Sequence, residues 1–223
     1  SHVGKEPIWA YQLQYAVETH TRSRLDLGPL GLGQFDISQA FDCERLYLLL
    51  PPRLKQPQLL QLQAQMEQII GQLQPQPWPV QGEMLDWQDI RALQESGVQI
   101  GAHPRHHVIL NRADAQTAHE EILGSRADIV TATRHMPAQF AYPNGSTTDF
   151  SERDVRIVRE AGFSTAVTTI EGTNRRGADP YKLLRHNVHE RRYRVPSGRL
   201  SRALFFSETS GLLGWLRLRR SAA

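Results

Sequence analysis

From Met84 onward, the sequence repeats one unit three times: an amphipathic helical stretch, a glycine or turn, and a short apolar run. This order is typical of α/β folds, in which the apolar runs become strands of a largely parallel sheet. The predicted strands are residues 98–100, 139–142 and 163–167. We therefore expect an α/β fold with helices outside the sheet.

Local start and stop signals support the three helices. Asp86 can cap the first helix, and Gly97 stands where that helix should end. The second helix starts near Asp114. The third starts at a cap formed by Ser151 and ends at Gly162.

The pattern before Met84 is different. Residues 7–20 and 57–73 place apolar side chains at helical spacing, which predicts two amphipathic helices. Residues 25–27 and 35–37 alternate apolar and polar residues around a glycine-rich turn, which predicts a hairpin. We expect a helical insertion and connector over 1–82, an α/β part over 83–190 and a basic C-terminal segment over 191–223.

Charge is unevenly distributed along the chain. The net charge is only +3, yet residues 185–220 hold nine arginines against Glu190 and Glu208. This segment could face an anionic glycan, a phosphate group or a membrane surface, or it could be a solvated tail. The chain lacks an aromatic stacking pattern and a known reader motif, which argues against nucleic-acid binding.

Other features narrow the class of protein. The sequence has no run of about 18 apolar residues, so it predicts no transmembrane helix. Cys43 is the only cysteine, which excludes an intrachain disulfide. Residues 1–7 hold neither an initiator Met nor the apolar part of a signal peptide, so we expect the native N-terminus to lie upstream. The compartment and the oligomeric state stay open, with the cytoplasm slightly favoured.

The sharpest chemical signal is Gly-Ala-His-Pro-Arg-His-His at residues 101–107, directly after the first predicted strand. His103 and His107 are four residues apart, and at a strand end both imidazoles can turn toward one metal ion. Strand carboxyl ends are where α/β barrels build their sites. By spacing alone, a histidine-rich surface loop explains the segment equally well, because no third ligand is nearby.

With its neighbours, this segment resembles the polysaccharide deacetylase family, also called carbohydrate esterase family four. The resemblance rests on residues 84–90 and 100–107. In that family a strand ends in Gly-Ser-His-Thr-x-x-His, whose histidines bind the metal. The resemblance implies that His103 and His107 bind a divalent ion, zinc, and that His106 is exposed rather than coordinating.

A second stretch, Phe-Ala-Tyr-Pro-Asn-Gly at 140–145, is similar to the family's Tyr-Pro-x-Gly motif, which shapes one wall of the substrate groove. Taken alone, the stretch fits a strand followed by an ordinary turn. In other branches an arginine orients the catalytic Asp from the place that Ala141 holds here. The substrate-binding residues implied are Tyr142, Pro143, Asn144 and Gly145.

Near the end of the predicted α/β part, Leu184-Arg185-His186 is similar to the family's Leu-x-His motif, whose histidine protonates the leaving amine. This would make His186 the catalytic acid, a role that suits the ordinary pKa of imidazole. Many members with Tyr-Pro-x-Gly instead carry an arginine followed by an apolar residue. In that alternative Arg185 is the matched position, as a substrate contact.

The resemblance extends to residues 4–21 and implies an incomplete, distorted (β/α) barrel of the polysaccharide deacetylase type, with an N-terminal helical insertion and without the first strand. That strand ends in Phe-Asp-Asp-Gly in the family and supplies the base and the third metal ligand. No Asp-Asp pair occurs in the 223 residues.

The function implied is metal-dependent hydrolysis of N-acetyl groups on a polysaccharide or amino-sugar glycan, impaired in this truncated chain. Such an enzyme is a hydrolase of carbon-nitrogen bonds other than peptide bonds, and its partner is an acetylated glycan. The alternative is a non-catalytic carbohydrate-binding or scaffolding remnant of the same fold.

Overall fold

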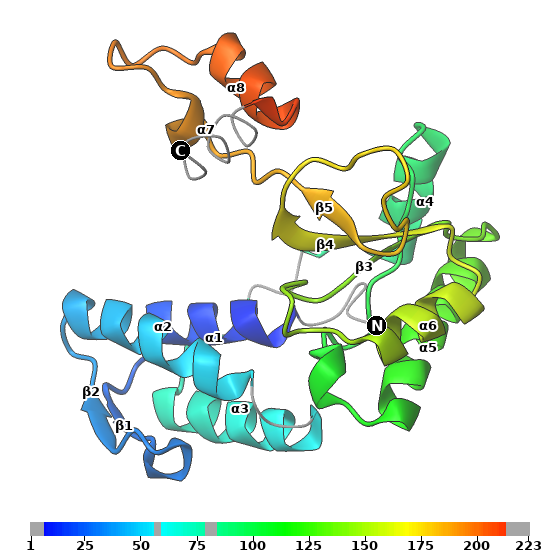
Figure 1. Ribbon diagram of the computed structural model, residues 1–223. Coiled ribbons are helices and arrows are strands. Elements are labelled where there is room, and N and C mark those ends of the chain that lie inside the picture. Colours follow the sequence, from blue (N-terminus) through cyan, green and yellow to red (C-terminus); the bar gives the residue numbers. More distant parts are fainter. Residues whose placement is uncertain (1–6, 56–58, 79–83, 213–223) are drawn as a thin grey trace.

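The computed structural model describes residues 7–55, 59–78 and 84–212 (Figure 1). It contains a parallel sheet with helices beside it, so the predicted α/β fold is correct. None of the described helices is both long and apolar enough to span a membrane. The N-terminal elements are α1 (Trp9–Glu18), β1 (Arg24–Asp26), β2 (Gln34–Asp36), α2 (Ala40–Leu54) and α3 (Leu59–Leu73), with a 3-10 turn at Gly28–Leu30.

These N-terminal elements, residues 9–73, form what we call the helical region. The helices predicted over 7–20 and 57–73 are present as α1 and α3, and β1 pairs with β2 as an antiparallel hairpin, as predicted. Positions 57–58 and 79–82 of the predicted helix and connector lie outside the described residues. The apolar stripes of the three helices meet in one buried cluster that includes Leu13, Leu46, Leu50, Leu54, Ile69 and Leu73.

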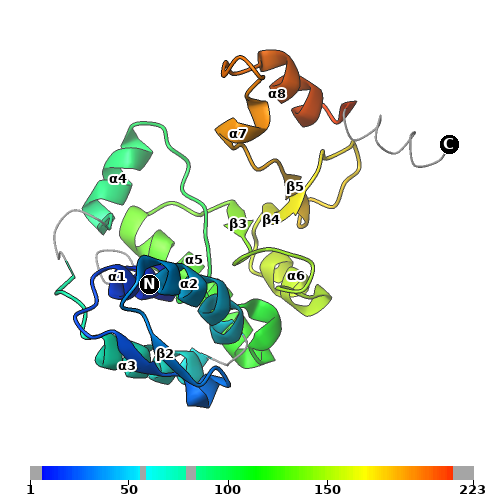
Figure 2. The ribbon, with the colours of Figure 1, turned by 90° about the vertical axis from the view of Figure 1, so that its left-hand side faces the viewer.

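The α/β region follows. Its elements are α4 (Trp87–Glu95), α5 (Ala115–Thr133), β3 (Gln139–Ala141), α6 (Glu152–Glu160), β4 (Thr165–Glu171) and β5 (Leu183–Arg185), with a 3-10 turn at Leu110–Arg112. Strands β3, β4 and β5 are parallel neighbours in that order, and α5 contacts both α4 and α6 beside the sheet (Figure 2). A second buried cluster joins these elements and includes Ile122, Phe140, Val158, Phe163 and Ala166.

The helix starts in this region are as predicted. Asp86 accepts hydrogen bonds from two backbone N–H groups of α4 and forms a capping box with Asp89. Asp114 accepts one from Thr117 at the start of α5. A capping box begins α6, and Gly97 and Gly162 follow α4 and α6 with positive φ angles.

The strand predicted at 98–100 is wrong, because these residues form no strand. Only Ala102 pairs with the sheet: it donates to Gln139 O (2.8 Å) and accepts from Ala141 N (2.9 Å). The next donor on this side of the chain would be residue 104, and Pro104 has no N–H. The pairing therefore stops after one residue, and the chain turns away into the histidine loop.

The C-terminal helices α7 (Glu190–Tyr193) and α8 (Arg202–Thr209) stand beyond β5 at one end of the molecule (Figure 1). Arg192 connects them to the sheet, because its guanidinium pairs with Glu171 at the end of β4 and with Glu208 of α8 (2.7 Å). No residue of α8 is buried.

Candidate metal centre

The two predicted metal ligands lie together. His103 directly follows Ala102, and the loop turns back at His107, whose φ is 56°. Their imidazole rings stack with centroids 4.7 Å apart and planes 22° apart. Both histidines line a pocket of about 480 Å³ whose walls are mostly apolar. Its other lining residues include Trp87, Ile90, Ile100, Ser125, Asp128 and Ile129.

The pocket keeps His103 neutral. Burial lowers the pKa of His103 from 6.5 to about 4, and the neighbouring His107 contributes in the same direction. Burial acts this way because a low-dielectric surrounding disfavours the charged imidazolium. At neutral pH the ring is therefore in the form that a metal ion requires, with a nitrogen lone pair available.

A buried carboxylate anchors the loop between the two histidines. Glu121 of α5 accepts from the backbone N–H of His106 (2.8 Å), and its other oxygen lies 2.6 Å from His106 Nδ1. Only 5% of the Glu121 side chain is exposed. His106 was expected to be exposed rather than coordinating; its side chain is 40% exposed, and its contact with Glu121 attaches the loop to α5.

Two turns further along α5, Asp128 fixes the same loop through an ion pair. The guanidinium of Arg105 donates to both oxygens of Asp128, at 2.8 and 2.6 Å. This carboxylate raises the pKa of Arg105. Gly124 makes room for the pair, because a Cβ there would lie 2.5–2.7 Å from the guanidinium. Glu121, Gly124 and Asp128 are spaced by three and four residues, so they form one stripe along α5.

This stripe was not predicted from the sequence. Its signal was present as two acidic residues seven apart on a predicted helix, with a glycine between them. Such spacing usually marks a solvated helix face. Nothing local shows that the basic loop at Arg105 and His106 folds over it.

The Tyr-Pro-Asn-Gly turn follows β3. Tyr142 is buried, stacks on Phe150 with centroids 4.1 Å apart, and donates to Tyr181 O (3.0 Å). Burial raises its pKa, so it is a neutral donor. Gly145 has a φ of 68°, and a Cβ there would lie 2.7 Å from Thr169 N, so the turn accepts only glycine. This turn lies at the sheet edge and does not line the histidine pocket.

The last predicted site residues come at the end of β5. Arg185 is exposed, and His186 Nε2 lies 3.2 Å from Thr173 Oγ1. Ala102, β3, β4 and β5 are successive neighbours, so the histidine pair and His186 are separated by three strand spacings, roughly 14 Å. The fold thus places the predicted positions at or just after strand positions of one parallel sheet, and it stacks the rings of His103 and His107.

The donor set at the pocket fits a divalent metal ion in part. Two adjacent imidazoles, one of them held neutral, supply two nitrogen ligands of the kind zinc prefers. Within residues 7–55, 59–78 and 84–212, no group of three or more His, Cys, Asp or Glu side chains could hold an ion. The described part therefore offers fewer than the three protein ligands of a catalytic zinc site.

Residues 66–166 match the profile of the polysaccharide deacetylase family. This match confirms the family resemblance, and it covers the histidine loop and the Tyr-Pro-Asn-Gly turn. No curated protein is significantly similar to the chain.

Several solved structures are similar to parts of the chain. The Streptococcus pyogenes deacetylase PplD in complex with acetate is 20% identical over 41% of this chain and 39% of its own, with a TM-score of 0.39. BC0361, a polysaccharide deacetylase from Bacillus cereus, is 22% identical over 48% and 33%, with a TM-score of 0.41. BA0330 from Bacillus anthracis is 20% identical over 56% and 37%, with a TM-score of 0.45. The chain spans less than two fifths of each of these proteins.

Proposed function

We propose that this chain serves the metal-dependent hydrolysis of N-acetyl groups on a polysaccharide or amino-sugar glycan. The observation that carries the proposal is the stacked pair of His103 and His107, which share one pocket inside the segment that matches the deacetylase family. The loop between the two histidines is held in place by the ion pair of Arg105 with Asp128 and by the contact of His106 with Glu121.

His103 and His107 would hold the metal ion, and zinc suits two imidazole ligands. The chemistry that such an ion supplies is Lewis acidity, which polarises a carbonyl oxygen and lowers the pKa of bound water. The protein's own contribution is geometric: Glu121 and Asp128 hold the loop through groups other than the ligands. Such outer contacts typically change metal affinity 10- to 100-fold when removed.

The remaining roles follow from the shared edge of the sheet. We assign the substrate wall to the turn of Tyr142, Pro143, Asn144 and Gly145, because it follows β3 beside the histidine loop. We assign His186 as the acid that protonates the leaving amine, and Thr173 orients its ring. Arg185 would bind the glycan, since it is exposed next to His186.

The architecture proposed is a section of a distorted (β/α) barrel. The open parallel sheet would form part of the barrel wall. The chain would divide into a helical insertion and connector (1–82), an α/β part (83–190) and a basic segment (191–223). Two separate buried clusters, one in the helical region and one in the α/β region, support a division near residue 82.

We expect the chain by itself to be a weak deacetylase. The described residues supply two imidazole ligands, and no carboxylate lies with them in a three-ligand group. A missing ligand weakens metal binding, and a missing general base removes about 100- to 10,000-fold in rate. The same observation favours a second function, non-catalytic carbohydrate binding or scaffolding by this fold.

One experiment separates the two functions. We would measure zinc binding, binding of acetylated amino-sugar oligomers and acetate release. The proteins compared are the unaltered chain, His103→Ala, His107→Ala and the control His119→Ala, which changes an exposed histidine of α5. The deacetylase predicts zinc binding and zinc-dependent acetate release that both ligand variants lose and His119→Ala keeps. Oligomer binding that persists in all variants without acetate release would support the non-catalytic function. Acetate release unchanged by both ligand variants would place the chemistry elsewhere.

A further inference from the structure

The C-terminal unit, residues 185–212, combines two surface properties, basic charge and exposed apolar side chains. Residues 185–212 hold six arginines and two glutamates, a net charge of +4; with Arg217, Arg219 and Arg220 the net charge of residues 185–223 is +7, whereas the whole chain carries +3. The first 184 residues are therefore net acidic, at −4. A charge asymmetry of this size marks a segment that meets an anionic partner.

Large apolar side chains are exposed among these arginines. Those with roughly half or more of their surface exposed are Val188 (62%), Leu200 (61%), Phe206 (56%) and Leu212 (47%). Within the part of the chain that the structure describes, Arg191, Arg199 and Arg202 form no ion pair with an acidic side chain, and Arg202 lies 6.0 Å from the Phe206 ring.

The unit is also well placed to contact a surface. Helices α7 and α8 project at one end of the molecule, away from the helical region (Figure 1), and no residue of α8 is buried. The contacts of Arg192 with Glu171 and Glu208 tie the unit to the sheet, so docking would orient the whole protein. In sequence, residues 213–220 continue the same composition, with Leu213, Trp215, Leu216 and Leu218 among Arg217, Arg219 and Arg220.

We propose that the C-terminal unit docks the protein on the surface of an anionic phospholipid membrane. Arginines attract such a surface electrostatically, and interleaved aromatic and leucine side chains enter the boundary between headgroups and acyl chains. A soluble anionic polymer would use the arginines and leave the apolar side chains in water. The exposed Leu200 and Phe206 are what favour a lipid surface. This inference does not depend on the deacetylase proposal.

The test is co-sedimentation of the full chain with vesicles of phosphatidylcholine alone or mixed with phosphatidylglycerol. We expect binding to the mixed vesicles that weakens as salt is raised, because salt screens the arginines. The double variant Arg191→Ala/Arg199→Ala should lower the partition constant by roughly 25-fold, at about fivefold per arginine. Phe206→Ser should lower it by about fivefold, as expected for a half-exposed aromatic ring that enters the boundary.

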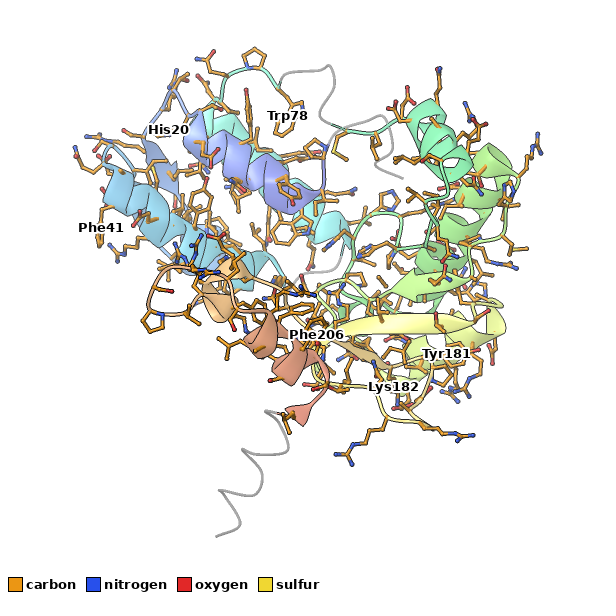
Figure 3. All side chains as sticks on the ribbon, turned by 90° about the horizontal axis from the view of Figure 1, so that it is seen from above. His20, Phe41, Trp78, Tyr181, Lys182 and Phe206 are labelled. Carbon is orange, nitrogen blue, oxygen red and sulfur yellow. The ribbon has the colours of Figure 1, made fainter. Side chains whose placement is uncertain are left out.

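Matched controls lie elsewhere on the molecule. Phe41→Ser removes an exposed phenylalanine from α2, far from Phe206 (Figure 3), and Arg175→Ala/Arg176→Ala removes two exposed arginines outside the unit. Both should bind vesicles like the unaltered chain. Equal binding to neutral and mixed vesicles, or no binding to either, would overturn the proposal. A third result would also overturn it. If the arginine variant weakens binding to vesicles and to soluble heparin equally, and Phe206→Ser changes neither, the partner is an anionic polymer.

Discussion

The helical region and the α/β region each bury an apolar cluster, but they differ in the charged contacts that accompany it. In the helical region, three amphipathic helices and a hairpin bury one apolar cluster, and the ion pair Arg24–Asp36 lies at the surface with a separation of 4.0 Å. In the α/β region, the carboxylates of Asp128 and Glu121 attach the histidine loop to α5 through close contacts with Arg105 and His106. Apolar burial is non-directional and is enough to form a hydrophobic core. Charged hydrogen bonds are directional, and they occur where the histidine loop must keep one geometry.

The largest expected effect is in the helical region. Leu50 is fully buried in α2, and Leu50→Ala should lower the free energy of unfolding by about 2–5 kcal/mol through lost burial and a cavity. Leu48→Ala is the matched control, because Leu48 is 76% exposed and its change should stay within about 0.5 kcal/mol. Urea unfolding measures both. Equal losses would show that the apolar cluster does not hold this region.

The next effect is specific to the α/β region and depends on pH. The pKa of His103 is about 4 in the folded protein and 6.5 when unperturbed. Between these values the unfolded chain takes up a proton that the folded chain does not, so stability is full above pH 6.5 and falls as the pH drops toward 4. The loss should reach roughly 2 kcal/mol at pH 5. Urea unfolding at pH 7 and pH 5 should show a smaller decline in His103→Asn than in the unaltered chain; an equal decline would contradict the prediction.

A somewhat smaller effect should come from the loop anchor. Glu121→Ala leaves the backbone N–H of His106 without its acceptor, which should cost about 1–2 kcal/mol of unfolding free energy. If the loop positions the metal ligands, zinc affinity should also fall by about tenfold. Glu120→Ala, one residue away and exposed, is the control for both measurements. A loss of stability with unchanged zinc affinity would limit Glu121 to a structural role.

The smallest effect concerns Arg105. Lysine lacks the planar guanidinium that donates two parallel hydrogen bonds to Asp128, and the arginine side chain is about one third exposed, so Arg105→Lys should cost about 1 kcal/mol or less. Raising the salt concentration should reduce the loss of unfolding free energy caused by Arg105→Lys, but not the loss caused by Leu50→Ala. Arg156→Lys, at an exposed position of α6, provides the baseline in the same unfolding experiments. A difference that does not respond to salt would mean that packing, rather than charge, explains it.

The helices also differ in how far the sequence predicts them. The helices with regular apolar spacing or capping residues, α1, α3, α4, α5 and α6, were all predicted, because these signals are local. Helix α2 was not predicted, and Pro51 and Pro52 in its last turns are residues that usually interrupt a helix. It forms because Leu46, Leu50 and Leu54 are fully buried against the other helices.

Some features of the candidate site could likewise be predicted from the sequence, and others could not. The spacing of His103 and His107, together with the family resemblance, is enough to identify the pair from the amino-acid sequence alone. Their stacking, the low pKa of His103 and the role of Glu121 could not be predicted, since each depends on α5 lying under the loop. The position of His186, three strand spacings away, depends on strand order, which the local pattern does not contain.

The sequence by itself determined the α/β class, the starts of the capped helices and the spacing by which His103 and His107 lie together, because periodicity, capping and motif spacing act over a few residues. Only the tertiary structure decided that residues 98–100 form no strand, that α2 is helical despite two prolines, and that Glu121 and Asp128 anchor the histidine loop. These outcomes rest on hydrogen bonds and burial between segments distant in sequence, whose free energies outweigh local preferences.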